Sequence, residues 1–210
     1  MISIQQDRMQ SLALQVADGI AAHGIVVVEH FLSRETIANL RAEAGQLRAQ
    51  HAFRRAGIGA GGDLRTREDI RGDEILWIEA DTESEPLREA LAAFEALRLA
   101  LNRELYLGLQ DFECHLARYC AGAGYQRHYD QLRGDNRRQL TVTLYLNENW
   151  CATDGGSLRV YLDEQDAQRT LEVMPAAGTL IAFLSERFAH EVLPCTRDRL
   201  SLTGWFLRRR

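Results

Sequence analysis

The sequence predicts an α+β fold in which helices cover one face of an antiparallel β-sandwich or barrel. Helical periodicity is confined to the first half of the chain, and short alternating segments separated by turns fill the second half. The length of 210 residues suits one domain, 1–210, and a hydrophobic content of 46% is enough for a sizeable core. We expect residues 1–111 to give mainly helical support and residues 112–207 to form the β core.

The first half begins with a predicted amphipathic helix, whose apolar residues lie four positions apart: Leu12, Val16 and Ile20. A continuous apolar run at 24–32 then predicts a buried strand, and Ser33 is a suitable N-cap for the next helix. Residues 54–72 are glycine-rich, charged and numerous, so we expect a mobile loop. Loops of that length inside compact domains are often lids or binding loops.

A strand at 73–80 and a long helix complete the first half. Ser84 and Pro86 mark the start of this helix. Its apolar face is formed by residues at helical spacing: Leu87, Leu91, Phe94, Leu97, Leu101 and Leu105. Turns such as "DGG" and "AAG" then separate eight predicted strands: 112–120, 125–131, 138–147, 156–162, 169–174, 178–184, 189–194 and 198–207.

The composition excludes several classes of function. The chain contains no lysine, and its 25 basic residues are all arginine, which excludes a lysine Schiff base and a Walker A phosphate loop. A fixed cation that binds an anion must therefore be arginine. The formal net charge of −5 disfavours nucleic acid as a partner. We expect no membrane insertion, because no apolar run approaches the roughly 20 residues that span a bilayer.

The cysteines predict a reducing compartment. The four cysteines include no C-x-x-C pair, which argues against a zinc ribbon or a thioredoxin site. The first residues, "MISIQQDRMQ", lack the basic-then-apolar pattern of a signal peptide. We therefore expect a cytoplasmic protein with free thiols. We also expect a monomer.

One short segment, "YQRHYDQ", places His128 and Asp130 two positions apart, on the same face of a strand. This is either a local polar pair or part of a metal site, and a third ligand decides between them. His190 is the candidate, and Arg199 follows nine residues later. Two histidines and one carboxylate form the facial triad that binds Fe(II) and leaves positions open. Because a guanidinium binds a carboxylate bidentately, Arg199 is suited to hold a dicarboxylate co-substrate.

Alternation along two strands predicts a polar interior around these residues. In 139–147 one face carries Thr141, Thr143 and Tyr145. In 198–207 one face carries Arg199, Ser201, Thr203 and Trp205. A barrel interior lined in this way holds a ligand.

Six segments together resemble the oxygen-sensing prolyl hydroxylases and their bacterial homologues. They are "HGIVVVEHFL", "DIRGDEILWIE", "GYQRHYDQ", "LYLNENW", "GGSLRVY" and "HEVLPC", and the resemblance extends from about residue 12 to residue 207. It implies a double-stranded β-helix (jelly-roll or cupin-like) fold. It also implies Fe(II) ligands at His128, Asp130 and His190. The implied 2-oxoglutarate pocket consists of Arg199, Tyr145, Tyr119, Leu158, Thr203 and Trp205.

The resemblance implies an enzyme that uses Fe(II), 2-oxoglutarate and dioxygen, with ascorbate as a stimulant, and releases succinate and CO2 on hydroxylating a prolyl residue. The implied partner is a protein with a flexible proline-containing loop, and elongation factor Tu is a candidate for a bacterial member. Two alternatives stay open: hydroxylation of free proline or another small molecule, and a non-catalytic β-helix binding module. The intact triad with Arg199 argues against the module.

Three more positions are implied to act near the substrate: Asp73, Arg138 and Trp77. We expect Asp73 to contact Arg138, with the neighbouring Arg137 as the alternative, and so to couple loop 54–72 to the strand that enters the barrel. Trp77 is either a wall of the site or a buried strand residue.

Two residues depart from the family pattern. His115 stands where animal members carry methionine near the co-substrate, and a rival interpretation makes His115 a metal ligand. Thr143 stands where an aliphatic residue is expected. Both changes make the predicted pocket more polar.

Overall fold

A computed structural model describes residues 2–57, 70–131 and 135–209 of the chain. The α-helices within them are α1 (Ile2–His23), α2 (Arg34–Ala49) and α3 (Glu85–Leu105). The strands are β1 (Ile25–Val28), β2 (Arg54–Arg55), β3 (Asp73–Ile78), β4 (Asp111–Tyr119), β5 (Tyr125–His128), β6 (Arg138–Tyr145), β7 (Leu158–Tyr161), β8 (Thr170–Val173), β9 (Leu180–Leu184), β10 (His190–Val192) and β11 (Arg199–Leu207). The eight strands predicted from residue 112 onward correspond to β4 through β11.

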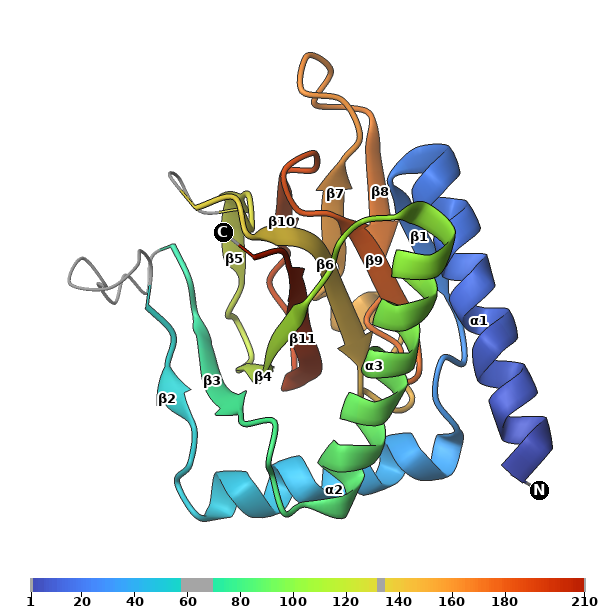
Figure 1. The fold of residues 1–210 in the computed structure, drawn as a ribbon. Coiled ribbons are helices and arrows are strands. Elements are labelled where there is room, and N and C mark those ends of the chain that lie inside the picture. The colour runs from blue at the N-terminus through green and yellow to red at the C-terminus, as the bar shows by residue number, and fades with distance from the viewer. Residues whose placement is uncertain (1, 58–69, 132–134, 210) are drawn as a thin grey trace.

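The strands form two antiparallel sheets (Figure 1). The larger has the order β1-β9-β6-β11-β4-β3-β2 and the smaller the order β5-β10-β7-β8. Two facing sheets with helices on one side form a jelly-roll, so the predicted α+β class is confirmed. Strands β1, β2 and β3 join the larger sheet, which therefore extends across the division expected at residue 112.

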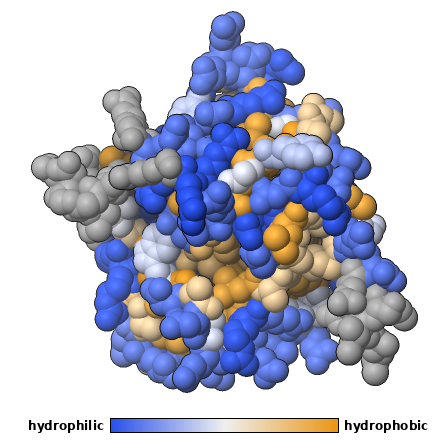
Figure 2. Space-filling model, in the orientation of Figure 1, coloured by the Kyte–Doolittle hydropathy of each residue, from blue (hydrophilic) through white to orange (hydrophobic). Residues whose placement is uncertain are grey.

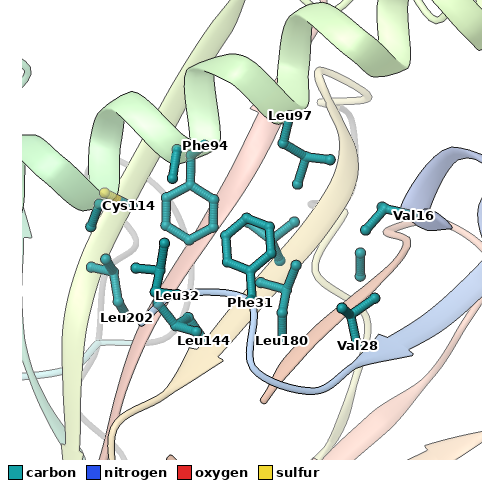
Figure 3. Packing of buried hydrophobic residues seen from close by; sticks show 14 of the residues in the cluster. Val16, Val28, Phe31, Leu32, Phe94, Leu97, Cys114, Leu144, Leu180 and Leu202 are labelled. Atoms are coloured by element: carbon teal, nitrogen blue, oxygen red, sulfur yellow. The ribbon is translucent and has the colours of Figure 1, made fainter. Parts of the chain in front are cut away.

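The helical layer covers the outer face of the larger sheet. In Figure 1, α1 and α3 lie side by side and α2 crosses at one end of the layer. Ser33 caps α2, as predicted, and its hydroxyl accepts from the Thr36 N–H at 3.0 Å. Figure 3 shows Phe94 of α3 beside Phe31, with Leu144 in the same buried cluster of sheet and helix residues. Burying a side chain of this size contributes about 1.5–3 kcal/mol.

Successive side chains of a strand point to opposite faces of the sheet, and this alternation divides the interior into two cores. Val142 and Leu144 of β6 pack under the helices, whereas Tyr145 packs between the two sheets. On β11, Leu202 packs under the helices, and Ser201 faces the space between the sheets. The structure thus has the alternation that the sequence predicts, with the polar face turned toward the second sheet.

One predicted strand is shorter than expected. Residues 24–32 include only the strand Ile25–Val28, and the chain then turns, with His30 at a left-handed φ of 55°. The Phe31 N–H donates to the carbonyl of Gly178 at 2.9 Å, which places the Phe31 ring in the core under the helices. A continuous apolar run does not distinguish a strand from a buried turn.

The start of the predicted 54–72 loop is also different. Arg54 and Arg55 form β2, which pairs with Ile75 and Glu74 at the edge of the larger sheet. Arg71 at the other end forms a β-bridge with Tyr125. The rest of the predicted loop, 58–69, lies outside the described residues.

Hydrophilic residues cover much of the molecule in the view of Figure 2, and hydrophobic ones gather near its centre. Within the described ranges, no helix combines the length and the apolar character needed to cross a bilayer.

Candidate active site

The two sheets enclose a cavity of about 630 Å³ that contains the predicted metal ligands. His128 ends β5 and His190 begins β10, and these two residues pair across the smaller sheet. Asp130 lies two residues beyond β5, and its carboxylate oxygens lie 3.7 Å from Nε2 of His128 and 3.4 Å from Nε2 of His190. The three residues each offer a ligand atom, all within 4.8 Å of one another. This donor set and spacing suit a facial triad.

Backbone carbonyls orient both imidazoles. Nδ1 of His128 lies 2.7 Å from the carbonyl oxygen of Gln126, and Nδ1 of His190 lies 3.1 Å from that of Phe188. With the proton on Nδ1 donated to these carbonyls, each Nε2 lone pair is free for a metal. The aligned strand backbone thus selects the tautomer that metal binding requires.

The carboxylate of Asp130 is held by a hydroxyl pair. Thr141 Oγ1 donates to Asp130 Oδ2 at 2.8 Å and lies 2.9 Å from Ser185 Oγ. Burial, together with the charge of the neighbouring His190, lowers the pKa of His128 to about 3 although Asp130 acts in the opposite sense. Burial acts in the opposite sense on Asp130, but the two imidazoles and the Thr141 hydroxyl outweigh it and lower the pKa of the carboxyl. His128 is neutral and Asp130 is ionised near neutral pH, as metal ligation requires.

Arg199 places a buried cation in the same cavity. The residue is only 2% exposed, and its Nε donates to the carbonyl of Gly156 at 2.8 Å. The guanidinium lies 5.1 and 5.0 Å from the ring centroids of Tyr119 and Tyr145. Among the described residues, no carboxylate forms an ion pair with it. An unpaired buried charge is costly, so this end of the cavity is suited to an anionic ligand.

Aromatic rings and a second arginine form one wall of the cavity. The guanidinium of Arg138 lies 3.6 Å from the ring centroid of Trp205 and pairs with Glu113 at 2.7 Å. The His115 ring lies 5.4 Å from Trp205 and 5.0 Å from Trp77. Because Trp77 is 45% exposed, this row of rings extends from the interior to the surface. Trp77 is therefore a wall of the site and not a buried strand residue.

The predicted contact between Asp73 and Arg138 is wrong. Asp73 instead forms a two-point ion pair with Arg71, whose Nε and Nη2 lie 2.7 and 3.0 Å from its carboxylate oxygens. Arg71 precedes Asp73 by only two residues, so its guanidinium lies close enough to pair with the Asp73 carboxylate in place of Arg138. It also lies 4.9 Å from the ring centroid of Tyr125, which stacks on His128 at 3.5 Å. Asp73 thus ties the segment at 71–73 to the metal-ligand strand through Arg71.

Comparison with known proteins identifies the family. The sequence profile of the 2OG-Fe(II) oxygenase superfamily matches residues 114–207. A crystal structure of a prolyl-4-hydroxylase from Pseudomonas putida superimposes with a TM-score of 0.85 at 44% identity, covering 94% of this chain and 100% of that one. This chain belongs to the prolyl hydroxylase family of 2-oxoglutarate- and Fe(II)-dependent oxygenases. The family assignment made from the six sequence segments is confirmed.

Animal members of the prolyl hydroxylase family are also similar. Egl nine homolog 1 of Mus musculus is 34% identical over 198 residues, which cover 88% of this chain and 46% of that protein. The chain spans about half the length of the curated Egl nine homolog 1 relatives. A prolyl hydroxylase from Trichoplax adhaerens, solved with a hypoxia inducible factor oxygen degradation domain peptide fragment, superimposes with a TM-score of 0.85 at 27% identity, covering 97% of this chain and 92% of that one.

The residues present fit the cofactors of this oxygenase family, which are Fe(II), 2-oxoglutarate and dioxygen. The triad offers two imidazole nitrogens and one carboxylate, and Arg199 offers a guanidinium that has no carboxylate partner among the described residues. The cavity brings together most of the predicted pocket and substrate residues: Arg199, Tyr119, Leu158, Thr203, Trp205, Asp73, Arg138 and Trp77. Tyr145 is fully enclosed beside Arg199. His115 lines the cavity but is not part of the cluster of ligand atoms.

The sequence analysis gave no specific role to three residues that the structure places beside the metal-ligand cluster or its supporting ion pair: Thr141, Arg71 and Tyr125. Thr141 shares a strand face with Thr143 and hydrogen-bonds Asp130, so strand parity could have identified it. Arg71 lies at i−2 from Asp73, the same spacing that drew attention to His128 and Asp130. Tyr125 stacks on His128 from three residues away, and no sequence pattern indicates that contact.

Proposed function

We propose that this chain hydroxylates a prolyl residue in a protein substrate, using Fe(II), 2-oxoglutarate and dioxygen and releasing succinate and CO2. One observation carries the proposal: a single cavity holds a metal-ligand triad and a buried arginine without a carboxylate partner among the described residues. A dicarboxylate that chelates the metal at one end and meets Arg199 at the other fits both features.

His128, Asp130 and His190 would hold Fe(II), which when bound supplies the activation of dioxygen. Arg199 would bind the C5 carboxylate of 2-oxoglutarate through its planar guanidinium. The hydroxyl of Tyr145, which has no hydrogen-bond partner among the described residues, would donate to the same carboxylate. Backbone carbonyls and Thr141 keep the ligands oriented.

The shape of the cavity mouth favours a protein substrate over free proline. The half-exposed Trp77 and the exposed Arg54 and Arg55 of the edge strand line the cavity, so its opening reaches the protein surface beside cationic side chains. A free amino acid needs an enclosed site that satisfies its two charges. An open rim accommodates residues on both sides of a proline, and the peptide-bound relative from Trichoplax adhaerens supports this mode.

We propose a proline in a flexible loop of elongation factor Tu as the first target to test. This finer step rests on the resemblance to bacterial prolyl hydroxylases and is an argument by analogy. A cytoplasmic location is proposed with it, since the four cysteines are free.

The test compares two substrates under the same conditions. We expect that incubation with Fe(II), 2-oxoglutarate and air adds one oxygen atom to a proline of elongation factor Tu, seen by peptide mass spectrometry, and leaves free L-proline unchanged. The Asp130→Asn variant is the matched control and should modify neither. Efficient hydroxylation of free proline without any protein product would contradict the proposal. Modification of a different bacterial protein would overturn only the choice of elongation factor Tu.

A further inference from the structure

His115 is a buried polar side chain of the cavity to which none of the roles above gives a function. It lies at the middle of β4, lines the cavity and is 2% exposed. Its Nδ1 atom is enclosed and has no hydrogen-bond partner among the described residues. Leaving a polar atom both buried and unpaired is unfavourable, and such atoms in native proteins call for an explanation.

The strand register places His115 beside the path between the metal ligands and Arg199. His115 pairs with Thr203 of β11, and Thr203 pairs with Thr143 of β6. Along β11, Thr203 lies four residues from Arg199 but only two from Trp205. Trp205 pairs with Thr141, the residue that hydrogen-bonds Asp130. His115 therefore lies beside the space between Arg199 and the triad, in the half of that space nearer to the triad.

Two aromatic rings restrict the imidazole. Trp77 contacts it edge-on at 5.0 Å between centroids, and Trp205 lies tilted at 5.4 Å. Neither ring accepts a conventional hydrogen bond in its plane. Neither ring nor any other described residue pairs with Nδ1, so a molecule bound in the cavity is the partner we consider.

We propose that His115 is a co-substrate-positioning residue, whose imidazole N–H donates a hydrogen bond to a C1 carboxylate oxygen of bound 2-oxoglutarate. The inference rests on the proposed function, because it takes 2-oxoglutarate as the ligand. Arg199 serves the C5 carboxylate, so the carboxylate nearer to the triad is the one left for His115. A dicarboxylate offers only acceptors, and a neutral imidazole carries one N–H donor.

Two other enclosed donors lack partners in the same region, the hydroxyl of Tyr145 and Nε1 of Trp205. Polar atoms without partners at and beside the cavity match a ligand with hydrogen-bonding oxygens and do not match an apolar one. His115 differs from Tyr145 and Trp205 because it departs from the family pattern, in which animal members carry methionine at this position.

The test measures 2-oxoglutarate binding to protein loaded with Mn(II) under argon, where no turnover occurs. We expect His115→Met, which keeps the bulk and removes the donor, to raise the dissociation constant about tenfold, as for a lost hydrogen bond to a charged group. His115→Gln, which keeps an N–H donor, should stay within about threefold of the wild type. The exposed His23→Met is the matched control and should bind normally.

Thermal unfolding of the ligand-free protein separates positioning from packing. Removing an unpaired buried polar group should leave the Tm of His115→Met at or above that of the wild type, while the rise in Tm caused by 2-oxoglutarate shrinks. A residue kept only for packing would show the reverse, a lower Tm and an unchanged dissociation constant, and that result would overturn the inference.

A measurement on the wild type covers the case in which His115→Met does not fold. With Zn(II) in the triad, adding 2-oxoglutarate should shift the ¹⁵N resonances of the His115 ring, which are assigned from the His115→Gln spectrum. Unchanged resonances on saturation would refute the role of His115 alone. A wild-type protein that binds no 2-oxoglutarate would refute the proposed function, and this inference with it.

Discussion

Replacing Asp130 by alanine is expected to abolish turnover and to weaken Fe(II) binding by more than tenfold, a loss above about 1.4 kcal/mol. Asp130 is the anionic member of the triad, and its oxygens face Nε2 of both His128 and His190. Without it, two imidazoles remain to hold a divalent cation in a buried site, where uncompensated charge is unfavourable. Isothermal titration under argon measures the binding, and succinate formation measures turnover.

Asp130→Asn tests the same point with less disturbance of the fold. The amide oxygen can still accept from Thr141 Oγ1, so the side chain can keep its place while losing its charge. Asp163→Ala is the control, since Asp163 forms an ion pair with Arg169 on the turn between β7 and β8. We expect both Asp130 variants to lose activity and Asp163→Ala to keep it. Unimpaired 2-oxoglutarate decarboxylation by Asp130→Ala would rule out the triad.

Replacing Arg199 by lysine is expected to lower 2-oxoglutarate affinity on the order of tenfold or more, about 1.4 kcal/mol, while Fe(II) binding persists. Lysine keeps the charge but offers a point donor in place of the planar fork. It also cannot reproduce the Nε hydrogen bond to Gly156, which helps to hold the guanidinium against Tyr119 and Tyr145. The dissociation constants of both ligands, measured separately, distinguish this effect from a general loss of structure.

Arg197→Lys provides a matched control two residues away. Arg197 lies in the β10–β11 connection just before the strand that Arg199 begins, but it is half-exposed, pairs with Asp154 at 3.0 Å and does not line the cavity. The Arg197→Lys variant should bind 2-oxoglutarate with the affinity of the wild type. If Arg199→Lys also binds 2-oxoglutarate normally, the anion-binding role belongs to another group.

Much of the site could be predicted because its determinants are local. The spacing of two predicted that His128 and Asp130 lie together, although β5 ends at His128, and the inward face of β11 follows from alternation. The positions of His190 and Arg199 could be predicted once their segments were recognised as strands. The resemblance to the prolyl hydroxylases then supplied roles that spacing alone leaves open.

The errors concern contacts for which two or more partners compete in the folded structure, or whose partner is distant in the sequence. We expected Asp73 to contact Arg138, but Asp73 pairs with Arg71. Arg138 instead lies over the Trp205 ring and pairs with Glu113. The two-residue strand β2 exists only because the edge of β3 is available to it, which residues 54–72 do not reveal. The turn at His30 depends in the same way on a distant partner, the carbonyl of Gly178.

The most direct test of the central claim is to measure succinate and hydroxyproline together. The chain, Fe(II), 2-oxoglutarate and a proline-containing protein substrate are incubated in air, and both products are quantified by NMR and mass spectrometry. A working oxygenase built on the triad and Arg199 predicts at least one succinate for each hydroxylated proline, and neither product without oxygen. Tight binding of Fe(II) and 2-oxoglutarate with no succinate, whatever protein is added, would contradict it and favour a binding module.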